Sequence, residues 1–415
     1  MKKIFLFCMM ALVAMCGLNS CSDDCDHDYI EYDYSKELVG TWTCLKADFA
    51  EALVFKADGT FASVGVANGE YWDYPDATWS LKGNKLALSS GDYKSNVRLE
   101  IIPGNSLALV DEKGNRNVFN YCENDLADEL IGMWVCNDSK MDAQNDMMIQ
   151  TFDANGKTVL TGFLPMKDNP DFVLNDETDY KVVGDLMFLE VPADKVGGDK
   201  PMYIAERLIY SPVASTLGDV MIFTNYSSDN SELLSETWLR IKQHLDLPDK
   251  KYDYNNTYVS NVKGLDEDMT MMGYTFNIGK MEGKNLDKML KTLLFAVEFP
   301  NANTLKYQYH YNGQNIAFEA RIVVDGNKVT IKMSEMYPYY RDVDMYMFQD
   351  QDNTQLHMYM PTSSFINYFG NMDVAALAFA GEIDVTDAAA VQAIFDRMDE
   401  RVESINVSFT FKAAK

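Results

Sequence analysis

One motif that occurs twice constrains the fold of this 415-residue chain more than any other feature. The octapeptide ELVGTWTC at residues 37–44 recurs as ELIGMWVC at residues 129–136. Two segments after each copy have a turn-forming pair of residues between apolar runs. In the first copy the pairs are Asp-Gly in 54–61 and Gly-Asn in 79–88, and in the second they are Asn-Gly in 151–158 and Gly-Asp in 180–188. Because these residues tolerate positive φ, each segment predicts a β-hairpin. The repetition therefore predicts two copies of one β-rich module.

Further alternating runs complete each module. They cover residues 99–102, 107–110 and 118–121 in the first copy, and residues 206–210, 220–224 and 237–241 in the second. About eight strands per copy are enough to close a small barrel, which leaves few strand edges exposed and turns alternate side chains inward. We therefore predict a mainly β fold with two tandem antiparallel barrels, over residues 35–123 and 127–246.

The two openings match the Gly-x-Trp that begins the first strand of lipocalins. Gly40 and Trp42 carry the match in the first copy, and Gly132 and Trp134 carry it in the second. On these residues both modules resemble the lipocalin-like domains of bacterial lipoproteins. The resemblance covers about half of the chain. It implies closed barrels and, by analogy of fold alone, a site for a small molecule.

The same resemblance implies a role for one arginine. In lipocalins an arginine on the last strand packs over the tryptophan, and Arg240 falls where such a residue would lie. A guanidinium stacked on an indole contributes roughly 0.5–2 kcal/mol. The first copy has Asn120 at the aligned place, so the signature is complete only in the second copy.

The region from residue 252 to residue 415 is less regular. Segments 299–305 and 322–331 echo the earlier hairpins, and Gly-Asn-Lys at 326–328 repeats residues 83–85, but no Gly-x-Trp precedes them. Apolar residues at helical spacing follow Asn285, a predicted N-cap, and Thr386. They are Leu286, Met289, Leu290, Leu293 and Leu294, then Val391, Ile394, Phe395, Met398 and Val402. With an alternating run at residues 405–411, this region predicts a divergent barrel or half-barrel with added helices.

The first twenty residues have the pattern of an export signal. Lys2 and Lys3 precede an apolar run at residues 4–15, which is too short to span a bilayer. The sequence LNSC at residues 18–21 resembles the bacterial lipobox, whose cysteine becomes the lipidated first residue of the mature chain. We therefore predict a signal peptide at residues 1–20 and a lipid on Cys21. An ordinary cleaved signal followed by a stray cysteine is the alternative.

An acidic tether at residues 21–34 follows the predicted lipid site. It resembles the acidic export signal of surface lipoproteins in Gram-negative commensals, which implies an outer-membrane protein exposed on the cell surface. The alternative is a solvated linker on a protein that faces the periplasm. The formal net charge of −27 argues against nucleic acid or anionic lipid as a partner. The sequence has no second apolar stretch long enough to cross a membrane, so attachment is expected through the N-terminal lipid.

The sequence offers little catalytic or metal-binding chemistry. Its four histidines, His27, His244, His310 and His357, have no zinc-like spacing, so we predict no metal and no cofactor. The Gly-x-Ser-x-Gly elbow and the phosphate- and dinucleotide-binding glycine loops do not occur at a strand-to-helix junction, so we predict no enzyme and name no catalytic residue. Cys44 and Cys122, on the first and last strands of one barrel, are either a disulfide or small apolar residues.

Methionine and tyrosine are concentrated between residues 333 and 360. Met345, Met347, Met358 and Met360 are candidates to line a ligand pocket, because thioethers adapt to apolar ligands. The alternative is that they are inward positions of two strands, with tyrosines on the opposite face.

Two functions are the main candidates, and a hydrolase is a third alternative, because any two of the 63 acidic residues could form a catalytic carboxylate pair. One is a barrel that binds a small apolar or glycan ligand, against which an interior cavity smaller than about 300 Å³ would count. The other is a structural or interaction module whose barrels present loops to a protein or polysaccharide partner.

Overall fold

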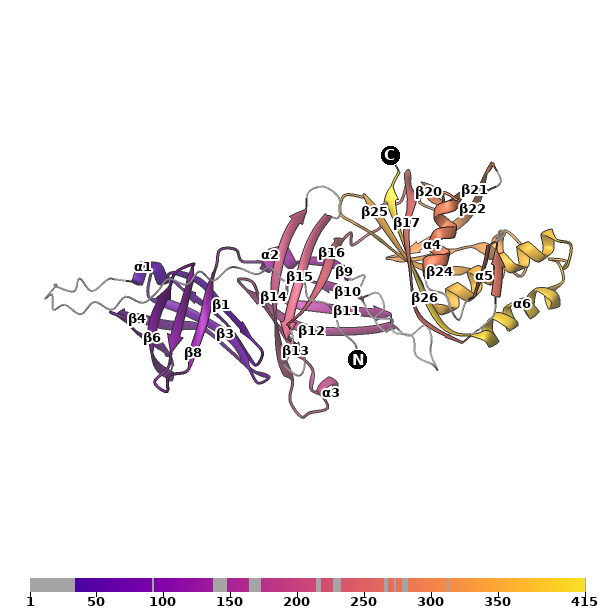
Figure 1. Ribbon diagram of the computed structural model, residues 1–415. Helices are drawn as coiled ribbons and strands as arrows, with labels where there is room; N and C mark the ends of the chain where they lie inside the picture. The colour runs from indigo at the N-terminus through magenta and orange to yellow at the C-terminus, as the bar shows by residue number, and fades with distance from the viewer. Residues whose placement is uncertain are drawn as a thin grey trace, which may run out of the picture. The chain divides into compact units, whose positions relative to one another are not determined.

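The structure, a computed structural model, is mainly β and describes residues 34–91, 93–136, 148–163, 173–213, 218–226, 233–264, 268–271, 274–277, 283–311 and 313–414. Within these residues the strands form three closed barrels of eight strands each and one small hairpin (Figure 1). The predicted mainly β fold with two tandem barrels is confirmed. The third region, predicted as a barrel or half-barrel, closes completely. The signal peptide, Cys21, His27 and the tether up to residue 33 lie outside the described residues.

Barrel 1 follows the first Gly-x-Trp and runs in chain order, with its last strand paired to its first. A one-turn helix, α1 (Ser35–Leu38), precedes it. Its strands are β1 (Gly40–Lys46), β2 (Phe49–Phe55), β3 (Thr60–Ala67), β4 (Glu70–Lys82), β5 (Lys85–Ser90), β6 (Tyr93–Ile102), β7 (Ser106–Val110) and β8 (Arg116–Cys122).

Barrel 2 has the same order and the same closure, between its last and first strands. A one-turn helix, α2 (Ala127–Leu130), precedes it, and α3 (Ala193–Val196) lies between its fifth and sixth strands. Its strands are β9 (Gly132–Cys136), β10 (Met148–Phe152), β11 (Lys157–Phe163), β12 (Val173–Val183), β13 (Leu186–Val191), β14 (Met202–Val213), β15 (Gly218–Tyr226) and β16 (Leu233–Ile241).

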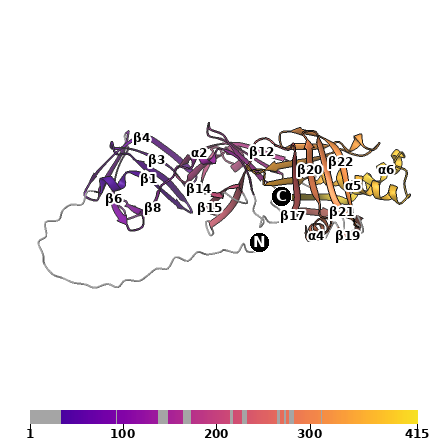
Figure 2. The ribbon, with the colours of Figure 1, turned by 90° about the horizontal axis from the view of Figure 1, so that it is seen from above.

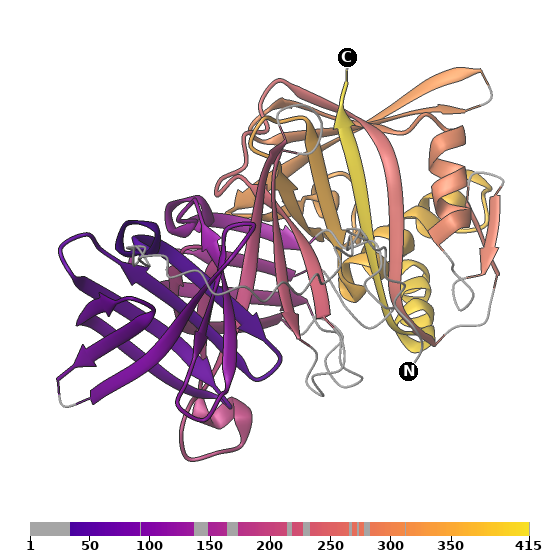
Figure 3. The ribbon, with the colours of Figure 1, turned by 60° about the vertical axis from the view of Figure 1, so that its left-hand side comes forward.

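Barrel 3 closes through the pairing of β26 with β17, the yellow and salmon strands that run side by side in Figure 3. Its strands are β17 (Lys250–Gly264), β20 (Ala296–Asn301), β21 (Thr304–Tyr311), β22 (Gln314–Asp325), β23 (Lys328–Ile331), β24 (Val343–Gln349), β25 (Gln355–Met360) and β26 (Val402–Ala413).

Two insertions distinguish barrel 3 from the others. After β17 come the hairpin β18 (Asp268–Met271) and β19 (Tyr274–Asn277) and the helix α4 (Gly283–Thr292). Between β25 and β26 come α5 (Thr362–Phe379) and α6 (Ala388–Arg401), which lie side by side beyond the strands (Figure 2). No helix in the described parts of the chain is long and apolar enough to cross a membrane.

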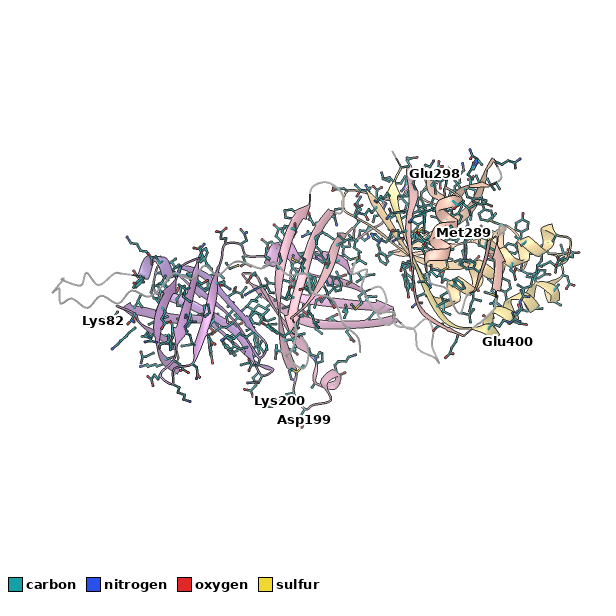
Figure 4. The ribbon with its side chains drawn as sticks, in the orientation of Figure 1. Lys82, Asp199, Lys200, Met289, Glu298 and Glu400 are labelled. Carbon is teal, nitrogen blue, oxygen red and sulfur yellow. The ribbon has the colours of Figure 1, made fainter. Side chains whose placement is uncertain are left out.

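The helix predictions are correct in position but wrong at their ends. Asn285 lies inside α4, which begins at Gly283, so it is not the N-cap. Leu294 lies beyond the end of α4 in a turn with a φ of 48° and is exposed, whereas Met289 on α4, labelled in Figure 4, is buried. Asp387 caps α6, because its carboxylate accepts hydrogen bonds from two first-turn amides.

The three barrels share a hydrogen-bond scheme that reveals barrel 3 as a third copy of the module. In the middle hairpins of barrels 1, 2 and 3, Gly83, Gly184 and Gly326 adopt positive φ, as a tight turn requires. The carbonyl of the residue after each glycine accepts a hydrogen bond of 2.8 Å from a backbone amide on the sixth strand of its barrel. The three amides belong to Leu99, Leu208 and Met347.

Large side chains of the described strands pack inside each barrel, as alternation along the strands requires. Within barrel 1, Phe55 stacks on Phe61 with centroids 5.5 Å apart, and Trp79 meets Phe55 edge-on. Barrel 2 buries two tryptophans, Trp134 and Trp238, in one apolar cluster. Barrel 3 has the largest cluster, to which strands from the whole barrel and the helices α4, α5 and α6 contribute.

The two glycines that open the first strands give a matched pair of variants. Gly40 and Gly132 have φ values of 138° and 137°, which an alanine adopts only with strain of about 1–3 kcal/mol. A Cβ at Gly40 would lie 2.5 Å from the Tyr121 ring, whereas at Gly132 it would meet nothing within 4 Å. Gly40→Ala also displaces Tyr121 from Trp42, which adds about 0.5–1.5 kcal/mol.

We therefore expect Gly40→Ala to lower the stability of its barrel more than Gly132→Ala lowers that of barrel 2. Hydrogen exchange of the β1 and β9 amides measures the two losses separately. Equal losses in the two barrels would contradict the role given to Tyr121.

Candidate functional site

The signature residues of the lipocalin resemblance lie in the core at the start of barrels 1 and 2. Trp134 is fully buried, and its indole nitrogen donates to the carbonyl of Leu130, the last residue of α2, at 2.8 Å. Trp42 donates to Leu38 of α1 at the same distance. A buried indole N–H needs an acceptor, and the one-turn helix supplies it. These tryptophans therefore join each helix to its barrel.

Arg240 lies over Trp134, with its guanidinium carbon 4.7 Å from the ring centroid. Strand pairing places the two residues opposite each other on β16 and β9. The guanidinium also lies 3.3 Å from a carboxylate oxygen of Asp219 and donates to the carbonyl of Glu129. Arg240 thus links α2, β9, β15 and β16, and its contacts are those of a structural residue.

In barrel 1 the residue opposite Trp42 is Tyr121, and the alignment to Asn120 was wrong by one position. The Tyr121 ring meets Trp42 edge-on, with centroids 5.1 Å apart. Asn120 lies on the other face of β8 and accepts a hydrogen bond from Ser106. Because side chains alternate along a strand, an alignment shifted by one residue compares an inward side chain with an outward one.

Cys44 and Cys122 are not joined by a disulfide, and both remain thiols. Although β1 and β8 are paired, Cys122 lies opposite Thr41, three residues from Cys44. At about 3.3 Å per residue this offset exceeds the reach of a disulfide. Cys44 is buried in the barrel, as is Cys136 at the equivalent position of barrel 2.

The four methionines proposed as a pocket are buried in barrel 3, on β24 and β25. Met345, Met358 and Met360 border a single apolar cavity, while Met347 is buried outside its lining. The volume of this cavity is about 40 Å³. Its lining consists of Leu286, Leu290, Phe295, Tyr307, Met345, Met358, Met360, Tyr368, Phe369, Phe409 and Phe411.

One polar atom in this cavity has no partner. Tyr307 is only 5% exposed, and its buried hydroxyl makes no hydrogen bond. Burial raises the pKa of Tyr307 far above its ordinary value, and it does the same to the pKa of Tyr368, whose ring lies 6.3 Å away. A buried hydroxyl without a partner costs about 1–3 kcal/mol. The cavity nevertheless falls well below the 300 Å³ expected for an enclosed ligand.

Barrel 2 carries a carboxyl group on its inner face. Alternation puts Glu206 on the same face as Ile204 and Leu208, which belong to the apolar cluster. Withdrawal from water, together with the charge of Glu236, raises the pKa of Glu206 to about 7. A hydrogen bond from Asn225 acts in the opposite direction and lowers this pKa, but by less. Glu236 in turn lies 3.3 Å from the indole nitrogen of Trp238.

The described histidines lie on separate segments: His244 between β16 and β17, His310 on β21 and His357 on β25. Burial lowers the pKa of His357 to about 4. Within the residues that the structure describes, no group of three or more histidines, cysteines and acids could hold a metal ion.

Among the aromatic side chains of barrel 3 that the structure describes, the two most exposed lie on one loop. This loop, residues 333–342, joins β23 to β24 and begins with a short 3-10 helix, η1 (Met333–Glu335). Tyr337 and Tyr339 are 46% and 54% exposed. Pro338 between them favours a turn, and the strand with Met345 and Met347 begins only at Val343. We call residues 333–342 the tyrosine loop.

Hydrogen bonds hold the tyrosine loop on α5. Asn371 accepts from the Arg341 amide at 3.0 Å and donates to the Arg341 carbonyl at 2.8 Å. Asn367 donates to the Asp342 carbonyl at 3.0 Å. The Asp342 carboxylate accepts from the amide and hydroxyl of Ser334, which ties the two ends of the loop together.

A second set of contacts holds the loop on α6 and in the core. The Arg341 guanidinium lies 4.2 Å from the centre of the Phe395 ring and donates to Asp399. Tyr340, next to the exposed pair, is buried and packs against Tyr337 with ring centroids 5.1 Å apart. Tyr339 has a φ of 69°, which a bulky side chain rarely adopts unless its surroundings enforce it. The loop therefore presents two aromatic rings from a fixed backbone.

The carboxyl group of Glu206 makes the stability of barrel 2 depend on pH. Its pKa in the folded chain, about 7, lies above the ordinary value of 4.5, so folding favours the protonated form. The stabilisation is complete below pH 4.5 and is lost as the pH rises through about 7. Glu206→Gln lacks this loss, so the melting temperature of the variant relative to the wild type should increase as the pH rises across this range. Thermal unfolding at several pH values measures this difference, with the exposed Glu177→Gln as control. A difference in melting temperature that does not change with pH would contradict the role given to Glu206.

Comparisons with known proteins assign no family to the chain. No protein-family model matches it, and no curated protein matches it. Among solved structures it is similar to the isotype 1 transferrin binding protein B (TbpB) from serogroup B Neisseria meningitidis. That likeness has 8% sequence identity and a TM-score of 0.21, and covers 89% of this chain and 68% of the other. At this distance the likeness assigns neither a fold nor a function to the chain.

Proposed function

We propose that this chain is a lipid-anchored lipoprotein of the outer-membrane surface that binds a partner and catalyses no reaction. In this proposal the three barrels are filled, rigid modules, and binding takes place on their loops. The observation that carries it is the tyrosine loop, where Tyr337 and Tyr339 are exposed on a backbone fixed by two helices. Tyrosine is enriched in binding surfaces because it offers a large apolar face and a polar tip.

The filled interiors support binding at the surface. The barrel 3 cavity, at about 40 Å³, holds only a few atoms, and large aromatic side chains such as Phe55 and Trp134 are buried in barrels 1 and 2. Small barrels of this kind serve as scaffolds whose variable parts are the connecting loops.

The predicted lipid on Cys21 and the acidic tether support an anchored protein on the cell surface. A formal net charge of −27 favours solubility outside the cell and disfavours nucleic acid and anionic lipid as partners.

Crosslinking on the outer membrane tests this function. The full-length protein should co-purify with the same partner in repeated preparations, and Tyr337→Ser with Tyr339→Ser should lower its recovery about tenfold or more, since exposed aromatic anchors dominate binding energy. The control is Tyr74→Ser, which removes an exposed tyrosine from barrel 1. Failure to recover any reproducible partner, or equal recovery with the loop variant, would sink the proposal.

A small ligand inside barrel 3 is the second candidate, and the unpartnered Tyr307 hydroxyl favours it. A ligand with an apolar body and one hydrogen-bonding group would satisfy that hydroxyl, and the methionines could move to enlarge the cavity. Met345, Met358 and Met360 would then contact its apolar part, whereas Met347 lies outside the lining.

Tyr307→Phe separates the two candidates. If the cavity is empty, removing a buried hydroxyl without a partner should leave stability unchanged or raise it by up to about 3 kcal/mol. If a ligand is bound, native mass spectrometry of protein from its own host should show an added mass that the variant loses. Met347→Leu, outside the lining, is the control and should retain that mass.

A further inference from the structure

We infer that the tyrosine loop is a binding platform for an uncharged carbohydrate. The inference deepens the proposed function and rests on it, because it names the chemical class of the partner. A sugar ring has one face made of C–H bonds and a rim of hydroxyl groups, and a tyrosine offers it an apolar face and a phenolic hydroxyl. Tyr337 and Tyr339 supply two such surfaces, separated by Pro338.

Two ion pairs include residues close in sequence to the tyrosines, and their donors and acceptors match the hydroxyl groups of a sugar. Arg321 forms a two-pronged ion pair with Glu335, in which Nε lies 2.7 Å from one carboxylate oxygen. Glu335 is two residues before Tyr337, and both members of the pair are about half exposed. Arg341, two residues after Tyr339, pairs with Asp399 at 3.2 Å. Planar donors and acceptors of this kind can bond to neighbouring hydroxyls while remaining paired.

The fixed backbone reduces the entropy lost on binding. Both ends of the tyrosine loop are tied, by Ser334 to Asp342 and by Arg341 to Asn371. The strained φ of Tyr339 is therefore maintained before any partner arrives. A surface arranged in advance spends less of its binding energy on ordering side chains. This favours a partner as weakly binding as a sugar, which contributes few strong contacts of its own.

The size and surroundings of the patch favour a carbohydrate over a protein. A stable protein interface covers about 800 Å² on each partner and has an apolar centre. Here two rings are exposed, and ion pairs flank them: Arg321 with Glu335, and Arg341 with Asp399. Because the chain carries a net charge of −27 and the arginines of the patch are already paired, an anionic polysaccharide would be repelled.

Affinity electrophoresis of the full-length, detergent-solubilised protein tests the inference. The probes are neutral polysaccharides, namely mannan, starch and arabinogalactan, with hyaluronan as the anionic comparison. We expect at least one neutral probe to retard the wild type. Tyr337→Ala with Tyr339→Ala should weaken its binding about tenfold or more. Tyr337→Phe with Tyr339→Phe keeps both rings and should retain most of the binding, while Tyr74→Ala should match the wild type.

The outcomes separate this inference from the proposed function. Loss of retardation in the alanine variant, with an unchanged melting temperature, supports the carbohydrate platform. If no neutral probe retards the wild type, or if hyaluronan binds best, the carbohydrate inference fails. If in that case a protein still crosslinks to the wild type and not to the loop variant, the proposed interaction function stands and its partner is a protein. If neither polysaccharide nor protein depends on the loop, both fail.

Discussion

The pairing of first and last strands is the constraint on which the rest of the structure depends. In each barrel this pairing closes the sheet, through β1 with β8, β9 with β16, and β17 with β26. Closure satisfies the backbone hydrogen bonds of both edge strands and forces alternate side chains into one small interior. Eight strands enclose a small interior, and in this chain it holds large buried side chains such as Phe55, Trp134 and Tyr252.

That constraint also directs function to the outside of the modules. With interiors occupied, the parts of the chain able to contact a partner are the connections between strands. In barrel 3 the connections include α5 and α6, which have no counterpart in the strand order of the other barrels. Asn367 and Asn371 of α5 and Asp399 of α6 bind the tyrosine loop, so the insertion creates the rigid base that an exposed aromatic pair requires.

The sequence predicted most of the fold because the repeat is local. The Gly-x-Trp openings and the turn-forming pairs mark strand ends, and alternation marks the inner face. Prediction was wrong where one residue decides the face, as with Asn120 and Tyr121, or where a helix end is set by packing, as with Leu294. The sequence left open whether the third region is a barrel or a half-barrel, because no Gly-x-Trp marks its first strand, whose buried aromatic residue is Tyr252.

By itself the sequence determined the mainly β class, the two openings and the absence of recognisable catalytic motifs. It did so because turn chemistry and side-chain alternation act between residues that are close along the chain. Only the tertiary structure decided that Tyr307 lacks a hydrogen-bond partner and that Tyr337 and Tyr339 remain exposed. Those properties depend on side chains far away in sequence, such as Tyr368 and Asn371, and local patterns carry no information about which distant groups will meet.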